Sequence, residues 1–482
     1  MHIRRNFADL DPPAIDTLRQ GVRTMKDTSR VPESDPRSWR FQANIHGTFD
    51  PPRPAWNQCQ HGSFLFLSWH RMYLYWFERI LRAASGDQNF ALPYWNWRVQ
   101  LRLPLPFRRP ADATTNPLYT AQRSSAINGG AQLQPSTVST AAAMNFTNFS
   151  SPPGSGLSFG GQRVSGPAHD TGPHGQLERQ PHDGVHDAVE GLMGDPATAA
   201  RDPIFWLHHA MIDRLWKVWL RRGGGRQNPE GNSVWMDTPF TFFDENGTQV
   251  TMRGQDVLHT ASQLDYRYDD DPAGGVSVRV PFFVPEAELA AAAQSNNNDD
   301  DGIDRTILGE SVGEDMIELG ATPRTVGVEL SDQAKERVAA VAQAAAVPLE
   351  ERIVLNVEGV QYYDQNPGVA YEVYLNLPEG QEPDFQSDYY VGNLGFFGTG
   401  THEVEAGGHG GHPGDQDFDV TDVVRALRDR GEWREGEATV SFVMRGLMLP
   451  VVEAEGAKGF AEQKEEPPGR PRVERVTITI GG

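Results

Sequence analysis

Cysteine and long apolar runs are almost absent from this chain of 482 residues. Its one cysteine, Cys59, excludes an intrachain disulfide, so packing and polar contacts must hold the fold together. No run of 18 apolar residues occurs, and no apolar segment follows the charged N-terminal sequence MHIRRNFADLDPPAIDTL. The sequence therefore predicts neither a membrane span nor a secretory signal. It favours a cytoplasmic location and leaves export by a separate carrier open.

Positive charge is also scarce. The chain has 43 basic and 65 acidic residues, which gives a net charge of −22, and no basic stripe is present. Such a surface repels phosphate backbones and excludes nucleic acid as a partner. Nothing in the composition indicates an oligomeric state.

The organisation of the chain changes after its middle. A length of 482 residues predicts two or three domains. Residues 1–285 are aromatic and carry helical patterns joined by Gly- and Pro-rich connections, whereas residues 286–330 are small, polar and acidic, as in a flexible linker. Residues 331–482 alternate β-branched and aromatic residues between turn signals. We expect a mainly α domain, a linker and a β-rich domain.

Histidine is the residue type whose distribution needs an explanation. Six of the 14 histidines fall in short aromatic segments of the first domain, namely His46, His61, His70, His182, His186 and His209. A lone buried histidine is most often a hydrogen-bonded core residue. A cluster of this kind favours a metal site instead.

Spacing constrains how these imidazoles can meet. His182 and His186 are four residues apart, so on a helix their rings can face one point. His61 and His70 are nine residues apart and would diverge on one helix. We therefore expect His61 to lie ahead of the helix that carries His70, and Gly62 permits such a break.

The adjacent histidines His208 and His209 point about 100° apart on a helix, so they cannot both bind one metal ion. Phe205, His209, Ile212 and Trp216 share one aromatic face, which makes His209 the expected ligand. Imidazoles without thiolate or carboxylate ligands suit copper, zinc, iron or nickel rather than hard ions. Two ions that share an anionic bridge would fit six neutral ligands.

At these residues the sequence resembles the type-3 dinuclear copper family, which comprises tyrosinases, catechol oxidases (polyphenol oxidases) and molluscan haemocyanins. The resemblance rests on HGSFLFLSWHRMYLYWFERIL, which starts at His61, and on DPIFWLHH with the DRLW that follows it. It implies two copper ions, with copper A held by His46, His61 and His70 and copper B held by His182, His186 and His209. It also implies a mainly α, loop-rich catalytic domain whose four-helix bundle holds the dinuclear site, followed by a β-sandwich domain as in plant enzymes.

Further residues take expected roles from the same resemblance. Cys59, two residues before His61, is expected to form a thioether bond to that histidine. Glu178 is expected to hold a water beside the copper pair, and Asp183 and Asp187 to tune phenol deprotonation. Many relatives that hydroxylate monophenols carry Asn where Asp183 stands, which puts monophenol hydroxylation in question.

Other positions around the expected site also match the family. Phe205 is expected to pack over copper B, and Asp213 with Arg214 to support the helix that carries its ligand. Pro196 stands where relatives gate the substrate pocket, and a proline there would leave the entrance open. The sequence from Tyr266 to Tyr268 resembles the motif that closes the catalytic domain of plant enzymes.

The resemblance implies an enzyme that oxidises o-diphenols to o-quinones while O2 is reduced to water, with hydroxylation of monophenols left open. Its partners would be phenolic small molecules and O2. The C-terminal domain would cover the pocket until it is cut or displaced, so the full chain would be latent. A haemocyanin-like oxygen carrier is the alternative, and a zinc hydrolase is disfavoured by the all-histidine ligand set. His409 and His412 either pass copper to the site or, more commonly for such a loop, are solvated.

Overall fold

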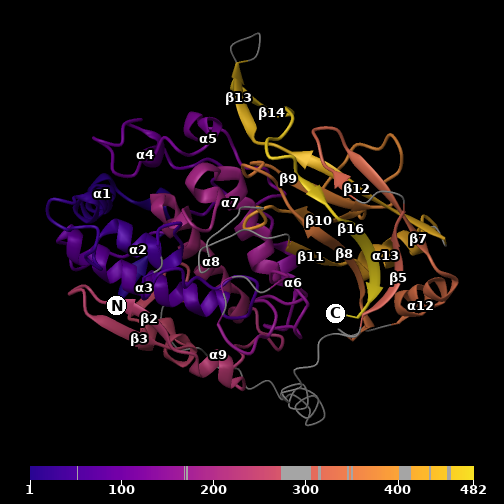
Figure 1. The fold of residues 1–482 in the computed structure, drawn as a ribbon, viewed down its shortest axis with the longest axis horizontal. Coiled ribbons are helices and arrows are strands. Elements are labelled where there is room, and N and C mark those ends of the chain that lie inside the picture. The colour runs from indigo at the N-terminus through magenta and orange to yellow at the C-terminus, as the bar shows by residue number, and fades with distance from the viewer. Residues whose placement is uncertain are drawn as a thin grey trace.

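The computed structural model describes residues 1–51, 53–167, 169, 172–272, 305–312, 316–344, 347–348, 351–400, 414–433, 436–452 and 458–481. The loop with His409 and His412 and the first part of the expected linker, residues 286–304, lie outside the described residues. Figure 1 shows the helices of the N-terminal half packed beside the strands of the C-terminal half. In the described ranges, no helix is both long enough and apolar enough to cross a membrane.

Helices form most of the N-terminal half, as its sequence patterns predict, although these patterns do not predict the helix at Trp39–His46. The longer ones are α1 (Pro12–Lys26), α2 (Trp39–His46), α3 (Phe66–Ser85) and α8 (Pro203–Arg221). Asp11 and Asp202 cap α1 and α8 by accepting hydrogen bonds from backbone amides, and a proline follows each cap, where its missing N–H has no cost. Shorter helices are α4 (Leu105–Arg108), α5 (Ser125–Gly129), α6 (Ala141–Asn145), α7 (Gly184–Val189), α9 (Ser233–Asp237) and α10 (Thr260–Gln263).

The expected break before α3 is present. His61 lies in a loop ahead of the helix, and Gly62 has a φ of 63°, a left-handed conformation that glycine adopts without strain. The prediction that His61 precedes the helix of His70 is confirmed. The helix begins at Phe66, slightly later than its apolar pattern predicts.

Short strands complete the N-terminal half. β1 (His2–Arg4) pairs in parallel with β4 (Tyr266–Tyr268), and β2 (Phe240–Phe243) pairs with β3 (Gln249–Met252). The pairing of β1 with β4 brings the two ends of this half together.

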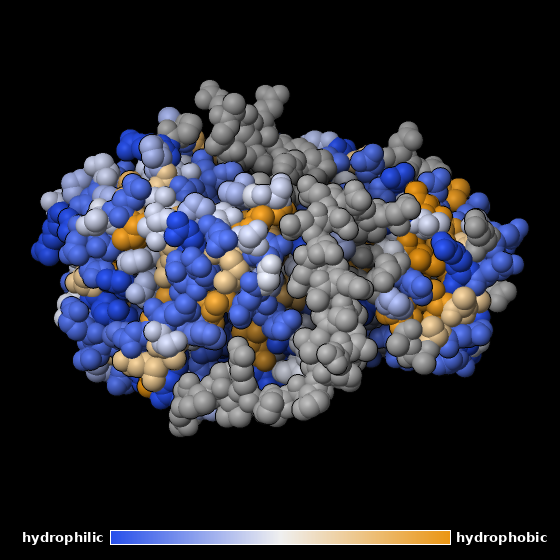
Figure 2. All heavy atoms as spheres, turned by 90° about the horizontal axis from the view of Figure 1, so that it is seen from below, coloured by the Kyte–Doolittle hydropathy of each residue, from blue (hydrophilic) through white to orange (hydrophobic). Residues whose placement is uncertain are grey.

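The C-terminal half is mostly β, as its alternating pattern predicts. Its strands are β5 (Thr306–Ser311), β6 (Ile317–Glu318), β7 (Arg324–Leu330), β8 (Ile353–Val360), β9 (Ala370–Leu375), β10 (Tyr390–Leu394), β11 (Gly414–Asp419), β12 (Glu437–Arg445), β13 (Met448–Val452), β14 (Lys458–Glu462), β15 (Arg472–Val473) and β16 (Arg475–Ile480). Its helices are α12 (Asp332–Gln343) and α13 (Thr421–Asp429). Figure 2 shows one face of the molecule, with hydrophobic side chains over both halves, and the exposed apolar residues include Leu105 of the helical half and Ile307 and Val312 of this half.

The sheet differs from the two-sheet sandwich that the resemblance implies. Eight strands form one sheet in the order β10-β9-β12-β7-β5-β16-β8-β11. The sheet curls until its end strands approach, and the side-chain amide of Gln416 on β11 donates to the carbonyl of Gly395, just after β10, at 2.7 Å. Strand twist accumulates over eight strands and brings the edges of such a sheet toward closure.

Two strands of this sheet fall inside the stretch for which the sequence predicts a linker. β5 covers residues 306–311, and β7 covers residues 324–330 and pairs with both β12 and β5 in the middle of the sheet. The residues around these strands are small and acidic, and this composition hides the short alternation of apolar and polar residues in TILGES and RTVGVEL.

Residues 176–180 of the helical half, which we call the seam segment, lie against both end strands of the sheet. Arg179 donates to the carbonyl of Asn393 on β10 at 2.9 Å, and its guanidinium lies 4.1 Å from the ring centre of Phe418 on β11. The backbone N–H of Asn393 donates to the side-chain oxygen of Gln180 at 3.3 Å. The seam segment therefore fills the gap between β10 and β11 and ties the two halves together.

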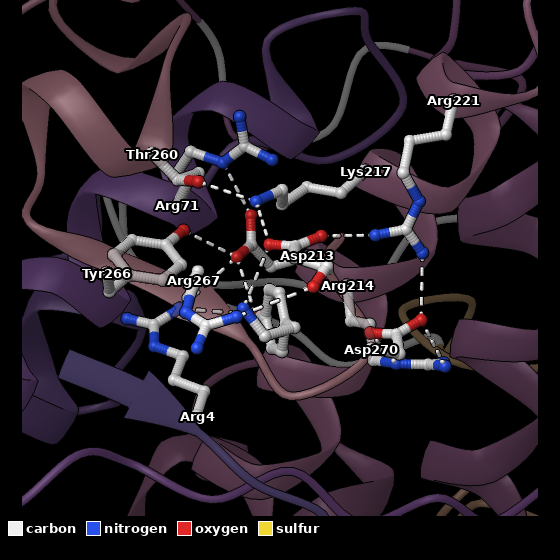
Figure 3. Close-up of polar contacts among 12 residues, drawn as sticks. Arg4, Arg71, Asp213, Arg214, Lys217, Arg221, Thr260, Tyr266, Arg267 and Asp270 are labelled. Atoms are coloured by element: carbon white, nitrogen blue, oxygen red, sulfur yellow. Dashed lines mark hydrogen bonds and ion pairs between the residues drawn. The ribbon is translucent and has the colours of Figure 1, made fainter. Parts of the chain in front are cut away.

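A buried network of charges joins α3, α8, β1 and β4 (Figure 3). Asp213 on α8 accepts hydrogen bonds from Arg71 on α3 at 2.5 Å, from Arg4 at 3.2 Å, and from the hydroxyls of Tyr266 and Tyr268 at 2.6 Å each. Burial alone would raise the pKa of Asp213, but the two arginines outweigh burial, and its pKa lies below the ordinary value. Asp213 is therefore charged and paired.

We expect Asp213→Asn to lower the free energy of unfolding by about 3–5 kcal/mol, because buried Arg71 loses the carboxylate that it pairs with and buried Arg4 keeps only Glu78. Asp270→Asn is the matched control, since Asp270 is 33% exposed and also pairs with two arginines, Arg214 and Arg221. The control should lose less than about 1 kcal/mol. Urea unfolding followed by tryptophan fluorescence measures both losses, and equal losses would contradict the role of the network.

Candidate dinuclear metal centre

The histidines singled out by the sequence converge in two buried groups. One ring nitrogen from each of His46, His61 and His70 lies within 4.8 Å of the others, and the same holds for His182, His186, His208 and His209. The groups adjoin, because the rings of His70 and His209 stack with their centres 4.4 Å apart and an interplanar angle of 8°.

Different elements carry these histidines. His46 is the last residue of α2, His61 lies in the loop before α3, and His70 lies one turn into α3. His182 lies in the irregular turn η2 (Glu178–Asp183), and His186 follows in α7. The rings of His182 and His186 are 4.5 Å apart, as their four-residue spacing predicts.

Backbone carbonyls orient three of the rings. The Nδ1 atoms of His46, His70 and His186 donate at 2.9, 2.9 and 2.7 Å to the carbonyl oxygens of Pro196, Phe66 and Met193, respectively. A carbonyl oxygen only accepts, so the proton resides on Nδ1 and the lone pair of Nε2 points into the site. Pro196, which the sequence predicts at the pocket entrance, thus also positions His46.

The two carboxylates that the sequence singles out as catalytic each hold one histidine. Glu178 accepts from Nδ1 of His61 at 2.8 Å and from the backbone N–H of Gly62 at 3.2 Å. Asp183 accepts from Nδ1 of His182 at 2.8 Å, and burial raises its pKa to about 6. Each group of histidines therefore has one ring fixed by a buried carboxylate, an arrangement that is typical of metal ligands.

The donor set fits metal ions. The Nε2 atoms of His46 and His61 face each other at 3.4 Å, and both carry lone pairs because both Nδ1 atoms donate protons. The Nε2 atoms of His70 and His182 are buried, and within the described part of the chain they have no hydrogen-bond partner. Burial holds the pKa of both rings well below the ordinary value, so they are neutral. Cations that prefer imidazole would satisfy these lone pairs.

His208 belongs to the second group by distance, but its ring is engaged elsewhere. The indole N–H of Trp97 donates to Nδ1 of His208 at 3.1 Å, and burial lowers the pKa of His208 to about 3. His209 instead faces the other group through its stack on His70, and Phe205 lies between His209 and His46, at 4.1 and 4.9 Å from their ring centres. These contacts favour His209 as the ligand.

Phe397 of the C-terminal half lies over the site. Its ring stacks on His186 with centres 4.0 Å apart and an angle of 24°, and two further histidine rings lie within 5.8 Å. Asp187 holds the loop in place, because it accepts from the backbone N–H of Phe396 at 2.8 Å and from the side chain of Asn366 at 2.7 Å. Burial raises the pKa of Asp187 to about 7.

Two further residues from the sequence analysis, Asp213 and Cys59, are also buried. Asp213 belongs to the charged network of Figure 3, where it supports α8. Cys59 is buried, and its sulfur lies 4.0 Å from Nδ1 of His169. The thioether bond between Cys59 and His61 stays a prediction.

The sequence analysis missed Phe397, Asn366 and His174, all of which lie near the site in loops. None repeats at helix or strand spacing, and His174 stands alone in GPHG. No local signal identifies them, because their contacts depend on how distant segments fold together.

Sequence comparisons find known proteins that are similar to most of this chain. The pattern of the common central domain of tyrosinase matches residues 36–170 and 131–222, and the polyphenol oxidase middle domain matches residues 231–280. A domain of unknown function matches residues 307–448. A tyrosinase from Hahella sp. (strain CCB-MM4) is 32% identical over 92% of this chain and 95% of its own length. A chloroplastic polyphenol oxidase from Malus domestica is 30% identical over 75% of this chain and 63% of its own length.

Solved structures share the fold of both halves. Latent apple tyrosinase has a TM-score of 0.62 at 22% identity, covering 100% of this chain and 97% of the other. A recombinant latent aurone synthase (polyphenol oxidase) has a TM-score of 0.60 at 22% identity, covering 100% and 89%. A helical domain followed by a mostly β domain is therefore a fold that these chains have in common.

Replacing one histidine of the adjacent pair tests which ring is a ligand. We expect His209→Asn to reduce bound copper from about two ions per chain to about one, because it removes one of the three imidazoles that the sequence resemblance assigns to copper B. His208→Asn is the matched control and should keep both ions, since the Asn oxygen can still accept from Trp97. Elemental analysis of the purified variants gives the count, and copper loss in His208→Asn alone would reverse the assignment.

Proposed function

Because the chain belongs to the tyrosinase and polyphenol oxidase family, we propose that it is a copper-dependent oxidase that converts o-diphenols to o-quinones. In a balanced cycle, two o-diphenols each give up two electrons and two protons, and one O2 accepts them to form two waters. The observation that carries the proposal is the meeting of buried imidazoles in two adjoining groups. Imidazole is a preferred ligand of copper.

We assign the ligands as the sequence does: His46, His61 and His70 to copper A, and His182, His186 and His209 to copper B. Bound copper would supply the electron transfer between phenol and O2. The four-helix bundle also belongs to the proposal, with α2, α3, α7 and α8 as its helices, since each carries at least one of these histidines. A thioether from Cys59 would fix His61, a ligand that lies in the loop before α3.

The surrounding residues orient the ligands and exclude water. Glu178 and Asp183 keep the Nδ1 protons of His61 and His182 in place, so that both rings turn Nε2 inward. Phe205 is buried and packs against rings of both groups, which keeps water away from that side of the rings. Either carboxylate is close enough to the ligands to take part in proton transfer from a bound phenol.

Contacts of the C-terminal half support a latent state of the proposed enzyme. Phe397 stacks on His186, the face against which a phenol ring would lie, and Asp187 anchors the backbone beside it. Substrate and Phe397 would therefore compete for one place. We propose that residues 1–285 form a helical catalytic domain and that the C-terminal domain is a separate unit. The stretch 286–330 would join the two, and its later part would contribute β5 and β7 to the C-terminal domain.

The enzyme assignment is tested on copper-loaded protein that has been cut between residues 286 and 304 and freed of its C-terminal fragment. We expect rapid oxidation of catechol and slower conversion of a tyrosine-like monophenol, because an aspartate follows the first copper B ligand. Quinone absorbance and O2 consumption measure both reactions. Reversible O2 binding without any catechol oxidation would support an oxygen carrier instead.

Phe397→Ala tests the latent state in the uncut chain. Removing a buried phenyl ring takes away about 2–3 kcal/mol that favours the closed form, and each 1.4 kcal/mol is a factor of about ten. We expect catechol oxidation by the uncut variant to rise by about 10- to 100-fold. Phe385→Ala, in the same domain, is the control and should leave it unchanged. If both variants behave like the parent protein, Phe397 does not block the site.

A further inference from the structure

His174 lies between the two carboxylates that hold one histidine of each group. Its Nδ1 is 2.8 Å from Oδ2 of Asp183 and 3.9 Å from Oε1 of Glu178. Asp183 binds His182 through its other oxygen at 2.8 Å, and Glu178 binds His61 at 2.8 Å. A continuous chain of polar contacts thus runs from one group of histidines to the other, and His174 is its central member.

The residues in this series of polar contacts differ in how exposed their side chains are. The side chains of Glu178 and Asp183 are 1% and 5% exposed, whereas that of His174 is 13% exposed. His174 comes from the loop GPHG, and its ring lies 6.1 Å from that of His61. It therefore reaches the carboxylates from the surface, without being a member of either metal group.

Asp183 can hold His182 only in one rotation of its carboxylate. One oxygen accepts from His182 and the other from His174, so both strong acceptor positions face a donor. Without His174, the second oxygen would be buried without this donor, and the carboxylate would gain freedom to turn away from His182. The orientation of a ligand would then no longer be fixed.

We propose that His174 is a positioning residue that fixes Asp183 and, through it, the copper B ligand His182. The inference deepens the proposed function and rests on it. A donor at the position of Nδ1 is the required feature, since that atom makes the contact with Asp183.

The test compares three substitutions in the uncut, copper-loaded chain. His174→Asn keeps a donor near the position of Nδ1, His174→Gln places its donor one bond further out, and His174→Leu has none. Copper content is measured after dialysis against increasing concentrations of a competing chelator. His259→Leu, which alters an exposed histidine, is the control.

We expect His174→Gln and His174→Leu to release about half of the copper at a 10- to 100-fold lower chelator concentration, the usual effect of losing a partner of a metal ligand. His174→Asn and His259→Leu should retain copper as the parent protein does. Comparing Asn with Gln keeps the test decisive even if the Leu variant does not fold. Equal retention by all variants would overturn the inference and leave the proposed function intact, whereas a parent chain that takes up no copper would overturn both.

Discussion

The buried ion pair between Arg71 and Asp213 fixes how α3 and α8 meet, and the candidate metal site depends on that fit. Arg71 directly follows His70, and Asp213 lies one turn beyond His209. A shift of either helix along the other would separate the charges inside the protein, which is strongly unfavourable. The stack of His70 on His209 is therefore set by a polar contact that lies outside the site. Arg4 and Tyr268 bring the two ends of the helical half to the same point.

Sequence spacing predicts which histidines can come together, because a helix fixes the direction in which each of its side chains points. His186 must face the same side as His182, and His61 must leave the helix of His70, on geometry alone. The strands of the C-terminal domain can also be predicted from the sequence, except β5 and β7, whose acidic surroundings suggest a linker. Phe397 and His174 could not be found in this way, since their roles arise only when a distant loop folds against the site.

The two halves meet through both apolar and polar contacts. Val354, Phe397 and Leu447 of the C-terminal half join the apolar core of the helical half. Asp187 and Arg179 add buried hydrogen bonds to backbone groups on the other side of the interface. Polar groups buried in this way must keep their partners, so the interface favours one orientation of the domains. The position of Phe397 over the histidines follows from that orientation.

The seam segment has a consequence for how a severed chain would behave. Arg179 still reaches Asn393 and Phe418 after a cut before β5, because the cut removes only the tether. The halves then form an ordinary bimolecular complex that obeys mass action. In a cut molecule, the C-terminal fragment would stay bound over the site at high protein concentration and would dissociate on dilution.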